Sequence, residues 1–169
     1  MNGYIHILVA ADLAADHEKI LPRAAGLAIA FGARLTLMHV VDEREAGGEL
    51  QMPVDGELSE RGSSLPRDAA AISGDIEYGG HRLERSAHAF LDDLARESGV
   101  PDVATAVVAS SAVARSIVEI ARDRAVDLIV VGGHSREGLE WLFGSTAGSV
   151  VRCAPCDVLV IRQSAGITA

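Results

Sequence analysis

The chain has 169 residues, of which 49% are hydrophobic and 23% are charged. These values are typical of one globular domain that is large enough to bury a core of its own. The formal net charge of −9 disfavours both a nucleic-acid partner and an anionic membrane surface, because each of these requires a basic face on the protein.

No stretch of the sequence has the pattern of a signal peptide or of a membrane span. Met1–His6 contains no basic segment followed by an apolar one. The longest uncharged stretch, Val103–Ala114, is shorter than the about 18 residues that a span requires. The two cysteines are too few for a disulfide framework. We therefore expect a cytoplasmic protein.

Five short apolar runs rich in β-branched residues predict strands that are buried on both faces of a sheet. They are Ile5–Ala10, Leu35–Val41, Val103–Ala109, Leu128–Val131 and Val158–Ile161. Segments with a helical pattern separate these runs. Alternation of strands and helices predicts right-handed βαβ units and a mostly parallel sheet.

The segments between the runs have apolar stripes with the period of an α-helix. The first stripe contains Ile20, Ala24, Leu27, Ala28 and Phe31, the second Leu83, Ala87, Phe90, Leu91 and Leu94, and the third Val113, Ile117, Ile120 and Ala121. A shorter helix is predicted over Ser145–Cys153. Gly32 is placed to end the first helix, and Pro22 is expected to delay its start or to kink it. Ser110 or Ser111 is expected to cap the third helix.

The stretch Asp42–Tyr78 does not fit this alternation. It contains five glycines, two prolines and ten acidic residues against three basic ones. It is also longer than most connections within a compact domain. The composition is typical of a solvated excursion from the fold, and the alternative is a lid over a ligand or a segment that docks a partner.

The segment after the fourth predicted strand is the most informative one. Val131 is followed by Gly132 and Gly133, then by a polar loop, and Gly144-Ser145-Thr146 opens the next helix. Glycines allow backbone N–H groups to approach an anion, and the start of a helix adds free N–H donors. This pattern is compatible with a phosphate cradle, although similar turns also serve only to reverse the chain. The sequence contains neither a Walker A motif nor G-x-G-x-x-G.

Asp12 directly follows the first predicted strand. Ligands of open parallel sheets bind beyond the carboxyl ends of the strands, where the strand order reverses. If the first and fourth strands are neighbours, Asp12 and the glycine turn flank one crevice, where the carboxylate can meet a ribose hydroxyl or a magnesium ion. The alternative is a structural role for Asp12 at a helix start.

Three other patterns in the sequence are weak indications of function. Cys153-Ala154-Pro155-Cys156 follows a helix, whereas a redox pair is expected at a helix N-terminus. Ser145, His134 and Asp12 are suitable types for a catalytic triad, but no G-x-S-x-G turn is present. Trp141 and Phe143 are more typical of packing or an interface than of base stacking.

Four blocks of sequence, spread over nearly the whole chain, match a single pattern. They are Tyr4–Leu13, Leu37–Asp42, Ile117–Ala121 with Val126–Gly132, and Gly144-Ser145 with Val150–Ile161. Together these blocks resemble the universal stress protein family, and the last two are the most specific.

The resemblance implies one domain over residues 1–169 with an α/β fold of the adenine nucleotide alpha hydrolase-like kind. Its open sheet would have five parallel strands in the order 3-2-1-4-5, with helices on both faces. Many members of the family form homodimers through the last strand. In this chain the last strand is apolar and would otherwise be an exposed sheet edge.

The family divides into members that bind ATP and members that do not. The binders resemble one another in a glycine, two residues, a second glycine, nine residues, and then glycine with serine or threonine. In this chain Ser135 stands at the second glycine, and eight residues separate it from Gly144. The shorter spacing resembles the non-binders and Gly144-Ser145 resembles the binders, so both alternatives stay open.

For a binder, the resemblance implies a site for ATP or ADP with magnesium. Its residues would be Ala10, Asp12 and Val41 near the adenosine, Val131, Gly132 and Ser135 along the pocket and phosphate turn, and Gly144, Ser145 and Thr146 at the terminal phosphates, with Arg136 as a further phosphate partner. No catalytic or metal-ligating residue is predicted, so we expect at most slow ATP hydrolysis.

The sequence therefore predicts a nucleotide-binding or sensing module of the stress response, which acts through its dimer and an unknown protein partner. A nucleotide-free interaction protein of the same fold is the first alternative. A small-molecule hydrolase is the second.

Overall fold

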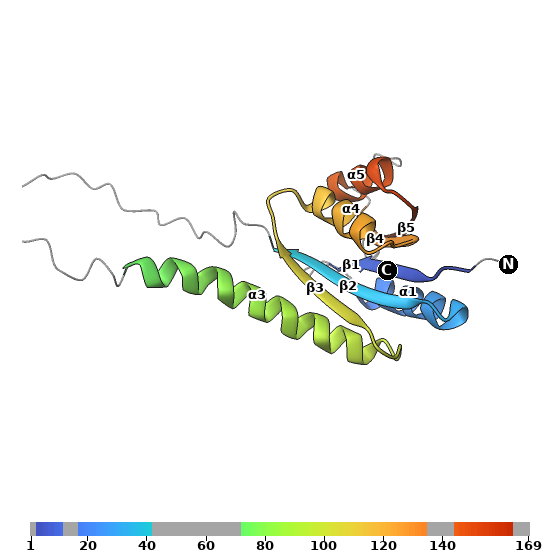
Figure 1. Ribbon diagram of the computed structural model, residues 1–169, viewed down its shortest axis with the longest axis horizontal. Helices are drawn as coiled ribbons and strands as arrows, with labels where there is room; N and C mark the ends of the chain where they lie inside the picture. The colour runs from blue at the N-terminus through green and yellow to red at the C-terminus, as the bar shows by residue number, and fades with distance from the viewer. Residues whose placement is uncertain (1–2, 12–16, 42–71, 135–143, 164–169) are drawn as a thin grey trace, which may run out of the picture.

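A computed structural model describes residues 3–11, 17–41, 72–134 and 144–163. One parallel sheet forms the centre of the molecule, with helices on both of its faces (Figure 1). The strands are β1 (His6–Ala10), β2 (Arg34–Val41), β3 (Ala104–Ala109), β4 (Leu128–His134) and β5 (Asp157–Gln163). The helices are α1 (His17–Phe31), α3 (Ile72–Glu97), α4 (Val113–Asp123) and α5 (Ser145–Cys153).

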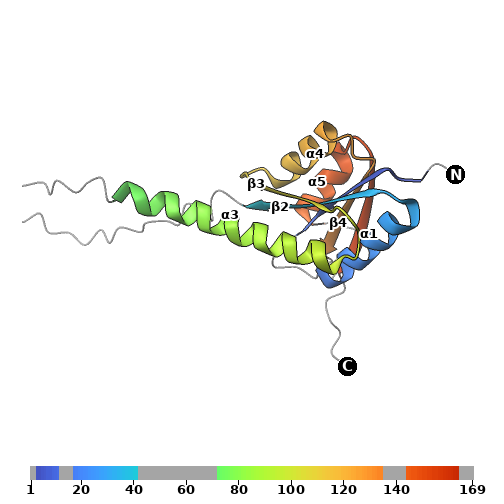
Figure 2. The same cartoon turned by 60° about the horizontal axis from the view of Figure 1, so that its bottom comes forward.

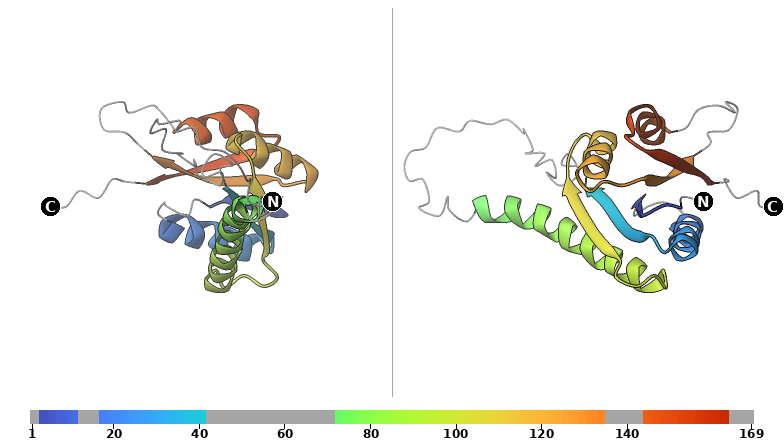
Figure 3. Two further views of the ribbon diagram at one scale, coloured as in Figure 1. Left: turned by 90° about the vertical axis from the view of Figure 1, so that its left-hand side faces the viewer. Right: turned by 45° about the vertical axis from the view of Figure 1, so that its right-hand side comes forward.

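The strand order is β3-β2-β1-β4-β5, which confirms the predicted topology. β1 lies at the centre and pairs with β2 on one side and with β4 on the other. α1 and α3 cover one face of the sheet, and α4 and α5 cover the opposite face (Figures 1 and 3). Strands β3 and β5 form the two edges.

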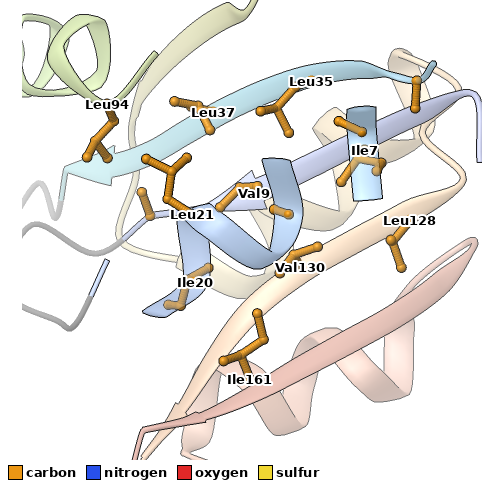
Figure 4. Packing of buried hydrophobic residues seen from close by; sticks show 14 of the residues in the cluster. Ile7, Val9, Ile20, Leu21, Leu35, Leu37, Leu94, Leu128, Val130 and Ile161 are labelled. Carbon is orange, nitrogen blue, oxygen red and sulfur yellow. The ribbon is translucent and has the colours of Figure 1, made fainter. Parts of the chain in front are cut away.

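The core between the sheet and the helices α1 and α3 follows from the alternation of side chains along each strand. Ile7 and Val9 of β1 point to this face, as do Leu35 and Leu37 of β2. Figure 4 shows how they meet the apolar stripe of α1. These four strand residues are at most 2% exposed, so the central strands are buried on this face below the carboxyl edge of the sheet.

The opposite core lies under α4 and α5. Leu8 and Ile129 of the central strands point to this face and meet Ile117 of α4 and Val150 of α5. All four side chains are at most 2% exposed. Because both helices follow parallel strands, their N-termini lie at the same carboxyl edge of the sheet.

Strand β4 is longer than the sequence predicts. It was expected over Leu128–Val131, but it continues to His134, and Gly132 and Gly133 pair with Ile161 and Arg162 of β5. The ladder between parallel strands is built from backbone groups, so the absence of side chains at the two glycines does not stop it. Both glycines therefore belong to the strand and not to the turn after it.

The predicted excursion over 42–78 is wrong at its C-terminal end. Residues 42–71 lie outside the described part, but α3 begins at Ile72 and has 26 residues. Its N-terminal part runs beyond the sheet (Figure 2). Extending an existing helix costs much less free energy than starting one. The C-terminal half of α3, which packs on the sheet, therefore supports continuation of the helix through the glycines of its N-terminal half.

The cap predicted for α4 is also wrong. Ala112, and neither Ser110 nor Ser111, is the N-cap residue, and it makes no side-chain cap hydrogen bond. Instead, the Ser110 hydroxyl accepts a hydrogen bond from the Ala112 N–H at 3.0 Å. Serine side chains often bond the backbone two residues on, and here that bond shapes the turn before the helix.

The two ends of α1 compare differently with the sequence predictions. α1 starts at His17, before Pro22, which lies inside the helix, so the expected late start is wrong. Gly32 ends α1 with a φ of +63°, as predicted for a left-handed C-terminal residue. Among the described residues, no helix is both long and apolar enough to cross a membrane.

Candidate functional site

A cavity of about 310 Å³ lies at the carboxyl edge of the sheet. Ala10 of β1 and Val131 of β4 contribute to its base, where the chain connections leave β1 and β4 in opposite directions. The walls come from the end of β2, from α4 and from the start of α5. This is the position at which open parallel sheets bind their ligands.

Six of the residues predicted for the site lie together around this cavity. They are Ala10, Val131, Gly132, Gly144, Ser145 and Thr146. Asp12, Ser135 and Arg136 fall outside the described residues. Val41 is 6% exposed and does not line the cavity, while its carbonyl accepts a hydrogen bond from the Ser110 N–H at 3.0 Å.

The first turn of α5 presents N–H donors at the cavity that no described helical carbonyl accepts. Gly144 is the N-cap residue, with φ −49° and ψ 157°, and it has no side chain that could cap the helix. The first helical bond runs from the Gly148 N–H to the Gly144 carbonyl at 2.9 Å. The N–H groups of residues 145–147 therefore have no acceptor within the helix. With the hydroxyls of Ser145 and Thr146, they form a site suited to an anion.

Most of the remaining cavity wall is apolar. Met38 and Val40 from β2 face Val113 and Ile117 from α4. None of the described residues that line the cavity is Asp, Glu, Lys or Arg. The arrangement therefore combines an apolar chamber with one polar end, as expected of sites that hold a flat organic group by contact and an anionic group by hydrogen bonds.

His39 is a site residue that the sequence analysis missed. A carbonyl oxygen can only accept, so the 2.8 Å contact between His39 Nδ1 and the Ala11 carbonyl places the hydrogen on Nδ1. The Ala11 N–H in turn donates to the Met38 carbonyl at 2.8 Å. Two bonds to β2 therefore hold Ala11, the residue that follows β1 and directly precedes Asp12.

Met38 and Val40, from the same stretch of β2, are two further wall residues that the sequence analysis missed. The register pairs Ala10 with Met38, so β2 continues three residues beyond the end of β1 and forms a wall. Only the register of the strands reveals this overhang, and a sequence pattern of buried strands does not specify that register.

The cysteines lie apart from the cavity. Cys153 ends α5 and Cys156 precedes β5, and both are free thiols. Burial, with Asp127 and Asp157 nearby, raises the pKa of the Cys156 thiol above its ordinary value, which disfavours the reactive thiolate. Among the described residues, no group of three or more His, Cys, Asp or Glu side chains is placed to bind a metal ion.

Comparison with known proteins gives this geometry a family. The model of the universal stress protein family matches residues 3–162. The chain belongs to the universal stress protein family. It is 30% identical over 160 residues to universal stress protein A homolog 1 of Coxiella burnetii, covering 94% of this chain and 96% of that protein. It is also 30% identical over 165 residues to a putative universal stress protein of Staphylococcus aureus, covering 96% of this chain and 86% of that protein.

Solved structures agree with the fold. The hypothetical protein MJ0577 superposes with a TM-score of 0.68 at 20% identity, over 96% of this chain and 99% of that one. A universal stress protein in complex with cAMP has a TM-score of 0.56 at 22% identity, and the match covers 96% of this chain and 100% of that one. A universal stress protein of Archaeoglobus fulgidus in complex with dAMP has a TM-score of 0.53 at 19% identity, over 94% and 98%. Both of these structural neighbours bind adenine nucleotides.

Proposed function

We propose that this universal stress protein binds an adenine nucleotide in the cavity at the carboxyl edge of its sheet and uses it as a signal in the cytoplasm. The observation that carries the proposal is the N-terminus of α5, where the N–H groups of residues 145–147 have no acceptor among the described helix residues and lie at one end of a cavity whose described wall is mostly apolar. ATP or ADP would place its base in the apolar chamber and its phosphates at Gly144, Ser145 and Thr146.

Two features of the cavity support adenine in the chamber. Its wall of Met38, Val40, Val113 and Ile117 is apolar and suits the faces of a purine ring. Two neighbours of the same fold hold cAMP and dAMP, which share the adenine base. In the proposed complex, Asp12 contacts the ribose or a magnesium ion, Arg136 and Ser135 contact the phosphates, and Val41 lies near the adenosine.

The proposed role is binding and not turnover. The described residues around the cavity offer His39 as the one titratable side chain, and the Ala11 carbonyl accepts its Nδ1 hydrogen. No described acid or base is therefore placed to activate water at the phosphate end. The nucleotide would act by changing the dimer or its affinity for a protein partner.

The proposed dimer uses strand β5. Val158 and Val160 are half-buried, and β5 forms one edge of the sheet. Pairing two β5 strands would satisfy the unpaired backbone groups of that edge. Light scattering tests the dimer, since we expect twice the 17.7 kDa mass of the chain, and a mass of one chain would refute it.

The nucleotide is tested on freshly purified protein. The protein is denatured, and the released small molecules are separated by chromatography and compared with AMP, ADP and ATP standards. We expect adenine nucleotide in a fixed ratio to protein, or uptake of added nucleotide by protein that was purified without it. Protein that neither retains nor takes up nucleotide would instead favour the nucleotide-free interaction protein.

A further inference from the structure

A second cavity, of about 750 Å³, lies between α4 and α5 on the outer side of the domain. Its α4 wall includes Val118 and Arg122, and its α5 wall includes Ser149 and Cys153. The two helices lie side by side (Figures 1 and 2). This cavity is called the α4–α5 groove below.

The α4–α5 groove adjoins the candidate nucleotide site. Val113, Ser145 and Thr146 line both cavities. Ser145 and Thr146 belong to the helix start at which the proposed phosphates bind. A ligand in the first cavity would therefore direct its phosphate end, and whatever that end carries, towards the groove.

The groove is elongated. It follows α4 from Val113 to Arg122 and α5 from Ser145 to Cys153. At a rise of about 1.5 Å per residue, these segments are about 12 to 14 Å long. This length accommodates a ribose and a base in line, and it is not needed for a mononucleotide that fills the 310 Å³ chamber.

The chemistry of the groove suits a nucleoside. Val118 is 6% exposed and forms an apolar floor together with Val113 and Ala114. Arg115, which is paired with Glu119 at 2.8 Å, and Arg122 are exposed on the α4 wall. Guanidinium groups stack on the faces of aromatic rings, and the hydroxyl of Ser149 can meet the edge of a base.

We propose that the preferred ligand is an adenine nucleotide whose phosphate chain carries a second nucleoside, and that this second nucleoside lies in the α4–α5 groove. This inference rests on the proposed function, because the first adenosine must occupy the chamber. It goes further by assigning the class of ligand and a second subsite.

The test compares two ligands with the same number of phosphates. Diadenosine tetraphosphate has a second nucleoside, and adenosine 5′-tetraphosphate lacks it. By calorimetry we expect diadenosine tetraphosphate to bind about five- to 150-fold more tightly, the usual gain from stacking one base on protein, with one molecule per chain. In protein labelled at valine methyls, the dinucleotide should shift Val118, and adenosine tetraphosphate should not.

Two matched variants on α5 test whether the gain in affinity for diadenosine tetraphosphate arises in the groove. Ser149→Trp fills the groove without touching the chamber, so the preference for the dinucleotide should disappear while adenosine tetraphosphate binds as before. Val151→Trp makes the same addition at a 44% exposed residue of α5 that does not line the groove. This control should keep the preference.

The possible failures are distinguishable. Equal affinity of the two ligands for wild-type protein, with no shift at Val118, would overturn the groove subsite and leave the proposed function standing. One dinucleotide per two chains would also overturn it, because the second adenosine would then occupy the chamber of a partner. Failure of both ligands to bind would refute the proposed function and this inference with it.

Discussion

Replacing Gly144 with aspartate should separate nucleotide binding from stability. Gly144 is the N-cap residue of α5, and its φ of −49° is accessible to any residue. A Cβ added there meets nothing within 4 Å. Aspartate is a better N-cap residue than glycine by a few tenths of a kcal/mol, so the variant should fold and melt at or slightly above the wild-type temperature.

The same substitution should abolish nucleotide binding. Its carboxylate would bond the N–H groups that are proposed to hold the phosphates. It would also place a negative charge about 5 Å from a phosphate, which at an effective dielectric constant of about 20 costs about 3 kcal/mol per charge pair. A loss of binding free energy of this size raises the dissociation constant by about two orders of magnitude.

Gly144→Ala is the matched control. Alanine adds the same Cβ into open space but has no charge and no capping oxygen, so it should bind nucleotide nearly as well as wild type and be slightly less stable than Gly144→Asp. Calorimetry measures the affinities, and thermal unfolding measures the stabilities. Wild-type affinity in folded Gly144→Asp would refute the assignment of the phosphate end to α5.

Three further predictions concern residues around the sheet. His39→Ala removes the donor to the Ala11 carbonyl and should weaken nucleotide binding by about three- to tenfold. His39→Asn should recover part of the lost affinity. Unchanged affinity of His39→Ala by calorimetry would show that this hydrogen bond does not position the site. Asp127 accepts hydrogen bonds from the N–H groups of Ile5 and His6 at 2.7 and 2.9 Å, so Asp127→Ala should lose about 1–3 kcal/mol in urea denaturation, and an unchanged midpoint would contradict this. Burial of His6 lowers the pKa of its ring below the ordinary value of 6.5, so the unfolded chain binds a proton at this ring more readily than the folded chain does. The free energy of unfolding should therefore fall as the pH decreases below 6.5. An equally steep fall in His6→Gln would assign the effect to other groups.

The central part of the fold was predictable because burial on both faces selects continuous apolar runs. All five predicted runs are strands, and the stripe that contains Ile117 forms the expected α4. The strand order came from resemblance to a family, since local patterns do not specify which strands are neighbours. The start of α3 at Ile72 was missed because the glycines of that segment disfavour a helix locally, and the packed half of α3 outweighs them.

The candidate site was predictable only in part, for a related reason. The residues around Gly144 form a local pattern of strand, turn and helix start, and the structure brings them to one cavity with Ala10 and Val131. The contributions of His39 and Val40 depend on how far β2 extends beyond β1. That distance is a property of strand register, which no short motif reports.

The most direct test of nucleotide binding is a calorimetric titration of nucleotide-free protein with ATP and magnesium. We predict one site per chain with a micromolar dissociation constant, and the loss of that binding in Gly144→Asp. Folded wild-type protein that releases or absorbs no heat up to millimolar ATP, and that does not compete for a fluorescent ATP analogue, would contradict adenine nucleotide binding at the carboxyl edge of this sheet.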